Sequence, residues 1–404
     1  MKSLLTLFFV FIVFPYYGTS QIGINPSGTA PSASAMLDVN STNKGLLIPR
    51  INLTSITDNT TIASPSLSLM VFNTNSSLPD GQGYYAWNGE MWVLIKSISL
   101  SPILGKNQFY IPVDGDPREF WVHVPIGYDP NTPTPMVIML HGTSGDGGEF
   151  YEKSGWKELG NEENIITVFP SSWHYRIIKP DGTTPHTTKW NTPPDAEWTF
   201  FPNEVPRNDI KFLRMMIASL KLKLNIDPHR IYLEGFSNGG QMASKCGIEM
   251  NDVLAAVCSN ASSFVLNNVT YTPARKLPVL YQHGNEDYGP GNTFPAIPLA
   301  SFEYTLNNYT QPLPARNNYE VSQAHIRHFN LNPVYGPIQI VMSNDNTHEI
   351  YRQVDFVGLS GEPNNNYRHI FVAGLGHKFP NENNFSHYDA PREHWKWMKQ
   401  FTLP

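Results

Sequence analysis

A serine within a glycine-rich stretch is the strongest candidate for chemistry in this sequence. Ser237 lies in Gly235-Phe236-Ser237-Asn238-Gly239-Gly240, directly after the apolar run 231–233 and before an expected helix over 241–250. A G-x-S-x-G pattern between a strand and a helix is typical of a nucleophile elbow, a strained turn that exposes the serine hydroxyl above a sheet. Side chains at 235 and 239 would collide with such a turn, and glycine removes the Cβ atom. Ser237 is therefore the candidate nucleophile.

A neutral serine hydroxyl is a weak nucleophile, so it needs a base, and the base needs a group that orients it. Behind a G-x-S-x-G elbow the acid follows the serine along the chain and the histidine comes last. One later apolar run ends in His283-Gly284-Asn285-Glu286-Asp287, and another leads to Gly374-Leu375-Gly376-His377. We predict His377 as the base and Asp287 as the orienting acid. Glu286 is the alternative acid, because one residue of loop register separates the two carboxylates.

The charge that develops on a carbonyl oxygen during acyl transfer requires backbone N–H donors. Asn238 follows the serine at the N-terminus of the expected helix, so its N–H is one predicted donor. The second should come from His141-Gly142-Thr143-Ser144-Gly145-Asp146-Gly147-Gly148, which follows the apolar run 136–140, with Thr143 as the candidate. This loop satisfies neither glycine-rich phosphate-binding pattern, so the sequence favours an oxyanion hole over a nucleotide site.

Metal and cofactor chemistry finds little support in the sequence. His325 and His328 can share a helical face, but no carboxylate completes a ligand set around them. His348-Glu349 lacks the second histidine of a zinc-protease motif, because position 352 is arginine. We predict neither a metal nor a cofactor. Cys246 and Cys258, the two cysteines of the chain, either pair in an oxidising compartment or remain buried thiols.

The elements that must position these residues lie in the C-terminal three quarters of the chain. Strand-length apolar runs alternate there with helical-period segments, which is typical of an α/β sheet. The expected helices are 209–224 and 241–250. The expected strands are 120–124, 136–140, 165–169, 231–233, 255–257, 278–281 and 370–372.

Composition divides the rest of the chain. Residues 21–97 are rich in Ser, Thr and Asn and carry short apolar pieces, with a hairpin signal at Asn88-Gly89, so a small β-rich module is expected. Residues 98–104 interrupt the pattern and are predicted to be a linker, which leaves 105–404 as the domain that carries the chemistry. The net charge of the chain is −6, and the sequence has no run of Lys or Arg residues. Both features argue against a nucleic-acid partner.

The N-terminus predicts export. Lys2 precedes an apolar run over 4–14, and Gly18 and Ser20 suit a cleavage site before Gln21, so residues 1–20 are expected to be a signal peptide. The run is too short for a permanent span, and no other segment reaches the roughly 18 apolar residues that a span needs. We therefore expect a secreted protein, extracellular or periplasmic, without a membrane span after removal of the signal.

Residues 105–404 resemble the exported esterases grouped as polyhydroxybutyrate depolymerase-like, feruloyl esterase and acetyl xylan esterase proteins. The resemblance is carried by Leu140-His141-Gly142, by 225–232 before the elbow, by the elbow itself and by Gly374-Leu375-Gly376-His377. It implies an α/β-hydrolase fold, here with a small β-rich N-terminal region. It also implies aromatic substrate contacts near Trp190 and Trp198, although packing of these tryptophans against the core is an equal alternative. The chain departs from the family after Asp287, where Tyr288-Gly289-Pro290-Gly291 replaces a usual Val-Pro-Tyr-like run.

Residues 21–97 resemble a module found at the N-terminus of many exported Bacteroidetes proteins, through 35–39, 41–45 and 84–89. This resemblance implies display or attachment, with an unknown partner.

The sequence as a whole predicts a secreted serine esterase that works through an acyl-enzyme. Feruloyl or acetyl esters of plant polysaccharide are the first substrate expectation, and polyhydroxyalkanoate polyester is the alternative. A serine peptidase and a non-catalytic attachment protein are the rival classes.

Overall fold

The computed structural model describes residues 21–79, 81–95, 103–179, 181–192, 199–264, 273–289, 294–359 and 364–404. Contacts divide the chain into two compact units, residues 1–99 and 100–404, called here the small and the large unit. The boundary falls in the expected linker, of which 98–102 lie outside the described residues, as does the whole predicted signal peptide. Among the described residues no helix is both long and apolar enough to cross a membrane.

The small unit consists of short strands with one modest core. β1 (Ile22–Ile24) and β2 (Leu37–Val39) form a parallel pair, and β3 (Arg50–Ile51), β4 (Met70–Asn73), β5 (Gly83–Trp87) and β6 (Trp92–Leu94) form a sheet in that order. The predicted hairpin is the β5–β6 connection, where the Asn88 side chain accepts the N–H groups of residues 90 and 91. The core of the small unit contains Leu53, Val71, Leu78, Tyr85, Trp87 and Trp92.

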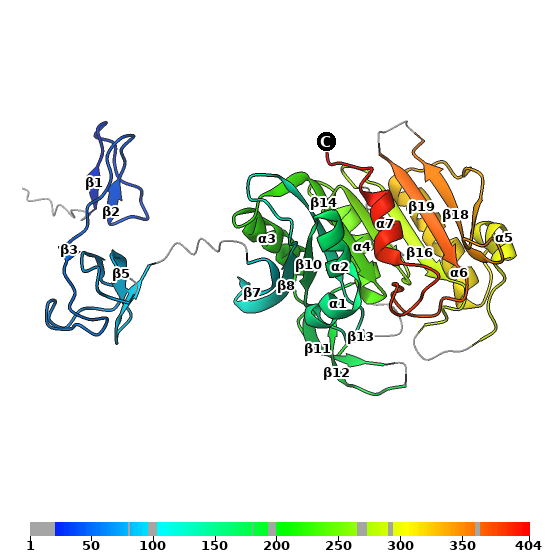
Figure 1. The fold of residues 1–404 in the computed structure, drawn as a ribbon, viewed down its shortest axis with the longest axis horizontal. Coiled ribbons are helices and arrows are strands. Elements are labelled where there is room, and N and C mark those ends of the chain that lie inside the picture. Colours follow the sequence, from blue (N-terminus) through cyan, green and yellow to red (C-terminus); the bar gives the residue numbers. More distant parts are fainter. Residues whose placement is uncertain are drawn as a thin grey trace, which may run out of the picture. The chain divides into compact units, whose positions relative to one another are not determined.

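The large unit is built on a ten-stranded sheet (Figure 1) whose described strands run in the order β17-β18-β19-β16-β15-β14-β9-β10-β8-β7. The six strands from β19 to β10 are parallel, and two antiparallel strands extend each side. The parallel strands are β9 (Thr134–Leu140), β10 (Ile166–Pro170), β14 (Ile226–Phe236), β15 (Ala256–Asn260), β16 (Val279–Gly284) and β19 (Asn366–Val372). The flanking strands are β7 (Gly105–Val113), β8 (Asp116–Val124), β17 (Gln339–Met342) and β18 (Glu349–Val357).

Helices cover both faces of this sheet. One face carries α3 (Asp209–Lys221), α4 (Asn238–Glu249), η1 (Leu299–Ser301), α5 (Phe302–Asn307) and α6 (Leu313–Phe329). The other carries α1 (Gly147–Lys153), α2 (Trp156–Glu163) and α7 (Ala390–Met398). A separate small sheet holds β11 (Trp173–Ile178) between β12 (His186–Lys189) and β13 (Thr199–Phe200).

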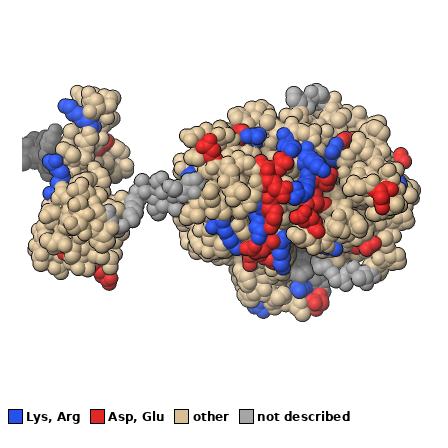
Figure 2. Space-filling view, viewed as in Figure 1, with Lys and Arg blue, Asp and Glu red and all other residues tan. Residues whose placement is uncertain are grey.

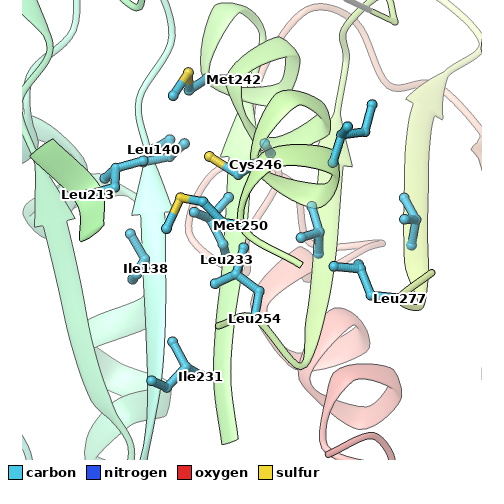
Figure 3. Close-up of a cluster of buried hydrophobic side chains, with 14 of the residues drawn as sticks. Ile138, Leu140, Leu213, Ile231, Leu233, Met242, Cys246, Met250, Leu254 and Leu277 are labelled. Atoms are coloured by element: carbon cyan, nitrogen blue, oxygen red, sulfur yellow. The ribbon is translucent and has the colours of Figure 1, made fainter. Parts of the chain in front are cut away.

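Side-chain alternation along the strands supplies a core on each face. Ile138 and Leu140 of β9 pack toward α3 and α4, whereas Val137 and Met139 pack toward α1, α2 and α7. Figure 3 shows the first of these cores, in which strand residues meet Leu213 and the sulfur-bearing side chains of α4. Strands buried on both faces consist of near-continuous apolar runs, which is why the sequence predicted all six parallel strands.

The outer face of α1, α2 and α7 mixes charges of both signs (Figure 2). Ion pairs join Lys106 to Glu152, Lys399 to Glu163 and Arg392 to Glu162 across it. Positive and negative side chains lie next to one another on this face.

Candidate active site

The nucleophile elbow follows from steric constraints at two glycines. Ser237 connects β14 to α4 with φ 54° and ψ −122°, a left-handed conformation that a serine adopts only under constraint. A Cβ atom on Gly235 would lie 2.0 Å from the Gly239 carbonyl oxygen, and one on Gly239 would lie 2.4 Å from the His141 oxygen. The Ser237 N–H is anchored by the Asn260 carbonyl oxygen at 2.9 Å. The predicted strand, turn and helix are therefore all present.

The structure brings Ser237, His377 and Asp287 together from three separate connections. His377 Nε2 lies 3.0 Å from Ser237 Oγ, and His377 Nδ1 lies 2.8 Å from Asp287 Oδ1. The loop after β16 provides the acid and the loop after β19 provides the histidine. A carboxylate can only accept, so Nδ1 carries the imidazole proton and Nε2 is left to accept from the serine hydroxyl. This is the geometry that a serine–histidine–acid site requires.

Burial distinguishes the two carboxylates of the acid loop. The Asp287 side chain is 2% exposed, whereas Glu286 is exposed to solvent. Burial by itself would raise the pKa of Asp287. The hydrogen bond and charge of His377, together with His283 and the Gly289 N–H, outweigh burial and lower the pKa below its usual range. Asp287 thus stays ionised beside the base, as an orienting acid must.

Two contacts that the sequence did not reveal hold the acid and histidine loops together. A Cβ atom at Gly284 would lie 1.9 Å from the Leu375 carbonyl oxygen, so the two loops pass at backbone distance. The buried Asn285 side chain accepts the Gly374 N–H at 2.7 Å and donates to the Ile297 carbonyl at 2.9 Å. Gly284 and Asn285 were the sequence signals for these contacts, and neither residue indicates such a contact without the fold.

The predicted oxyanion donors border the serine. A Cβ atom on Gly142 would lie 3.2 Å from Ser237 Cβ, so the loop that carries Thr143 passes directly against the elbow. Among the described residues, neither the Thr143 N–H nor the Asn238 N–H donates a hydrogen bond. Both donors are therefore available, as an oxyanion hole requires.

His141 fixes the start of this loop. Its ring is fully buried and contacts the Gly142 carbonyl through Nδ1 at 2.7 Å, while Nε2 accepts the Ser172 N–H at 2.9 Å. Both ring nitrogens are occupied by backbone groups, so a neutral ring with its proton on Nδ1 satisfies each of them.

Trp190 lies under this loop and not at its surface. The side chain is 0% exposed, its indole N–H donates to the His141 carbonyl at 2.8 Å, and its backbone N–H donates to the Asn238 side chain at 2.7 Å. A tryptophan with no exposed surface offers nothing for a substrate to contact, which corrects the expectation of a substrate-binding Trp190. The geometry supports the packing alternative. Trp198 lies outside the described residues.

Other candidate residues occupy structural positions. Cys246 and Cys258 are buried free thiols. The His325 ring is buried and stacks on Tyr367, with ring centroids 4.3 Å apart. No cluster of three or more metal-ligating side chains occurs within the described ranges.

Acidification is expected to destabilise the large unit before most carboxylates titrate. Burial lowers the pKa of His141 to about 4 and that of His325 to about 3, from 6.5. Between these values and 6.5 the unfolded chain binds more protons than the folded one. Stability is therefore complete above the unfolded pKa and is lost as pH falls through this window. Each histidine contributes a slope of up to about 1.4 kcal/mol per pH unit.

Urea unfolding at about pH 7, 6 and 5 measures this slope, because ordinary carboxylates titrate mostly below about 4.5. His325→Phe keeps an aromatic ring in the cluster and should reduce the slope. An unfolding free energy that stays constant over this range would contradict the expectation.

A mixed sheet with helices on both faces, an elbow after a central strand and a histidine after a later one define the α/β-hydrolase fold. The small β-rich unit precedes it.

Comparison with known proteins gives matches to both units. A family model described as a phage tail like trimerisation region matches residues 23–107. Feruloyl esterase B of Piromyces equi is 26% identical over 173 residues, covering 42% of this chain and 29% of that protein. Poly(3-hydroxyalkanoate) depolymerase C of Paucimonas lemoignei is 30% identical over 139 residues, covering 34% and 29%. The curated relatives thus include the esterase and depolymerase types that the sequence resemblance indicated.

Among solved structures, the acetyl xylan esterase of Aspergillus awamori aligns with 14% identity and a TM-score of 0.46, covering 72% of this chain and 99% of that one. The matched segments span between 22% and 58% of the length of the curated relatives.

Proposed function

We propose that this protein is a serine esterase that hydrolyses carboxylic esters through an acyl-enzyme. The observation that carries the proposal is the contact chain from Ser237 Oγ to His377 Nε2 at 3.0 Å, and from Nδ1 to Asp287 at 2.8 Å. Ser237 Oγ attacks the ester carbonyl carbon while His377 takes its proton, and the Thr143 and Asn238 N–H groups face the resulting oxyanion. His377 then returns the proton to the leaving alcohol. Water, deprotonated by His377, releases the acid and restores the serine.

Esters of plant polysaccharide, feruloyl or acetyl, are the proposed substrates. Support comes from the names of the relatives, which include a feruloyl esterase and an acetylxylan esterase/xylanase. Polyester is the second candidate, because a poly(3-hydroxyalkanoate) depolymerase is also among them. We also propose that residues 1–20 are a signal peptide and that the protein is secreted, which would bring it into contact with polymeric substrates outside the cell.

The purified protein assayed on methyl ferulate, acetylated xylan and polyhydroxybutyrate tests this proposal. We expect release of ferulate or acetate at rates well above those of the Ser237→Ala variant. Hydrolysis of polyhydroxybutyrate alone would select the polyester candidate. Cleavage of peptide substrates without ester hydrolysis would favour the rival class of serine peptidase. Failure to react with a fluorophosphonate probe would favour the rival class of non-catalytic attachment protein.

For the small unit we propose self-association into a trimer. The matching family is described as a trimerisation region. The β1–β2 pair and the segment after it leave Ile22, Ile24, Met36, Leu37, Val39, Leu46 and Leu47 exposed, with Leu47 78% exposed. An isolated two-stranded sheet is marginal by itself, and contiguous exposed apolar side chains mark an interaction surface. Equivalent segments of two further copies would cover these side chains.

Light scattering coupled to gel filtration is expected to give a mass about three times that of one chain. Leu37→Ser combined with Leu47→Ser should convert the trimer to monomer, because both changes remove apolar surface from the proposed seam. Leu222→Ser, at a 90% exposed position of the large unit, is the matched control and should leave the mass unchanged. A monomeric wild-type protein would refute the proposal.

A further inference from the structure

A second buried histidine faces the oxygen of Asp287 that His377 leaves free. Oδ1 accepts from His377 and from the Gly289 N–H, whereas Oδ2 has no hydrogen-bond partner among the described residues. His283 Nδ1 lies 3.8 Å from this Oδ2, and the two side chains are only 1% and 2% exposed. His283 belongs to the end of β16, and Asp287 follows in the next turn. The contact is therefore built into the short segment that delivers the acid.

The neighbours of His283 locate its proton. The Tyr281 hydroxyl donates to the Ser262 carbonyl at 2.8 Å, so its oxygen is left to accept from His283 Nδ1 at 3.3 Å. His283 Nε2 has no partner among the described residues. Nδ1 therefore carries the proton, and its two oxygen neighbours are the Tyr281 phenol oxygen at 3.3 Å and Asp287 Oδ2 at 3.8 Å. Burial lowers the pKa of His283, which keeps the ring neutral.

The titratable groups around His283 come from four segments: Asp287 on the acid loop, His377 on the histidine loop, Tyr281 on β16 and His369 on β19. Burial lowers the pKa of His369 well below its usual range. Its ring is held by Ser322 at 2.9 Å and Asn318 at 3.1 Å. Asp287 is the carboxylate in this set, so His283 Nδ1 lies 3.8 Å from an oxygen of the one anion among them.

We propose that His283 is a positioning residue for the serine–histidine–acid site: its Nδ1–H supports the free oxygen of Asp287 and keeps that carboxylate turned toward His377. This inference rests on the esterase function proposed above. When the Ser237 proton moves to His377, the imidazolium needs an ionised acid beside it. A buried carboxylate oxygen without a donor is costly. The 3.8 Å contact is longer than a hydrogen bond, and catalytic contacts of this kind tighten as charge develops. No proton leaves His283.

Three substitutions at this position separate a hydrogen-bonding role from packing. His283→Asn places an amide N–H near the position of Nδ1, His283→Gln places one near Nε2, and His283→Phe keeps the ring without a donor. For p-nitrophenyl acetate we expect the Asn variant to retain kcat within about 3-fold. The Gln and Phe variants should lose about 10-fold or more in kcat with KM little changed, because Asp287 is no longer held in the orientation that positions His377.

The pH dependence of kcat/KM distinguishes the two roles, because a residue that only fills space would leave it unchanged. Removing the N–H dipole leaves Asp287 with a stronger pull on the proton of His377. The His377 titration, followed by NMR of labelled histidine, and the acid limb of kcat/KM should therefore both move to higher pH in the Gln and Phe variants. The Asn variant should titrate like the wild type.

Equal kcat values and equal His377 titrations in the three variants would overturn the proposal, and so would a Phe variant more active than the Asn variant. If His283→Phe does not fold, the comparison of Asn with Gln decides. The NMR titration requires no turnover. An inactive wild type whose His377 still responds in the expected order would refute the esterase and keep the positioning role. Ser237-dependent hydrolysis that is indifferent to residue 283 would refute only the positioning role.

Discussion

Replacing Ser237 with alanine is expected to lower kcat for p-nitrophenyl acetate by about 10⁴-fold or more, with the fold unchanged. In the proposed mechanism the hydroxyl forms the covalent bond to the acyl group. Among the described residues, the hydroxyl that lies within hydrogen-bond distance of His377 Nε2 is that of Ser237, at 3.0 Å. Serine hydrolases that lose the nucleophile keep only the contribution of the oxyanion hole and of binding. The backbone of the elbow is held by Gly235 and Gly239, not by the hydroxyl, so unfolding should be little affected.

A fluorophosphonate probe provides a second measurement of the same prediction, since it should label the wild type and not the Ser237→Ala variant. Ser343→Ala is the matched control. This serine lies in the connection between β17 and β18, at the outer side of the sheet, and its loss should change neither labelling nor turnover. Undiminished ester hydrolysis by the Ser237→Ala variant would refute the mechanism.

Replacing Glu234 with leucine is expected to destabilise the large unit by about 3–5 kcal/mol. The side chain is 0% exposed and lies three residues before the nucleophile. Its Oε1 accepts from His394 Nδ1 at 2.5 Å and from Asn260 Nδ2 at 2.7 Å, and its Oε2 accepts from the Trp156 indole at 2.9 Å. Leucine would leave all three donors buried without an acceptor. Because Asn260 also holds the Ser237 N–H, esterase activity should fall as well.

Urea unfolding followed by tryptophan fluorescence measures this loss. Glu162→Leu is the matched control, because Glu162 also joins α2 to α7, through Arg392, but its side chain is 49% exposed. Solvent screening limits such a pair to about 1 kcal/mol or less. Similar losses of unfolding free energy in the two variants would contradict the expectation that the buried hydrogen bonds of Glu234 hold α7 against β14.

The central strands and the elbow were predictable because their causes are local. β9, β10, β15, β16 and the second half of β14 are buried on both faces, so their apolar runs stand out in the sequence. The edge strand β17, by contrast, has mostly exposed residues, and nothing in its sequence separates it from a loop. The sheet of β11, β12 and β13 was also missed. Its strands are short, and in β11 and β12 buried positions alternate with half-buried or exposed ones, so neither forms a continuous apolar run.

Some residues of the candidate site could likewise be predicted from local sequence, and others could not. Ser237 and its glycines could be identified because a strained turn excludes side chains from its immediate chain neighbours. Trp190 could not be placed, because a tryptophan in an aromatic loop suits a substrate contact and a buried support equally well. Its hydrogen bond to the His141 carbonyl joins segments that are 49 residues apart. His283 was not predicted from the sequence, because its proposed role depends on where one ring nitrogen lies relative to Asp287.

The sequence alone was sufficient to predict the elbow and the six parallel strands. Each depends on steric or hydrophobic constraints among residues close in sequence. Three further features required the fold: Asp287 and not Glu286 contacts His377, Trp190 packs beneath the loop that carries Thr143, and His283 lies beside Asp287. The first and the third depend on loop register, which is set where the acid and histidine loops pass at backbone distance beside Gly284. Contacts between segments about ninety residues apart leave no local trace in the chain.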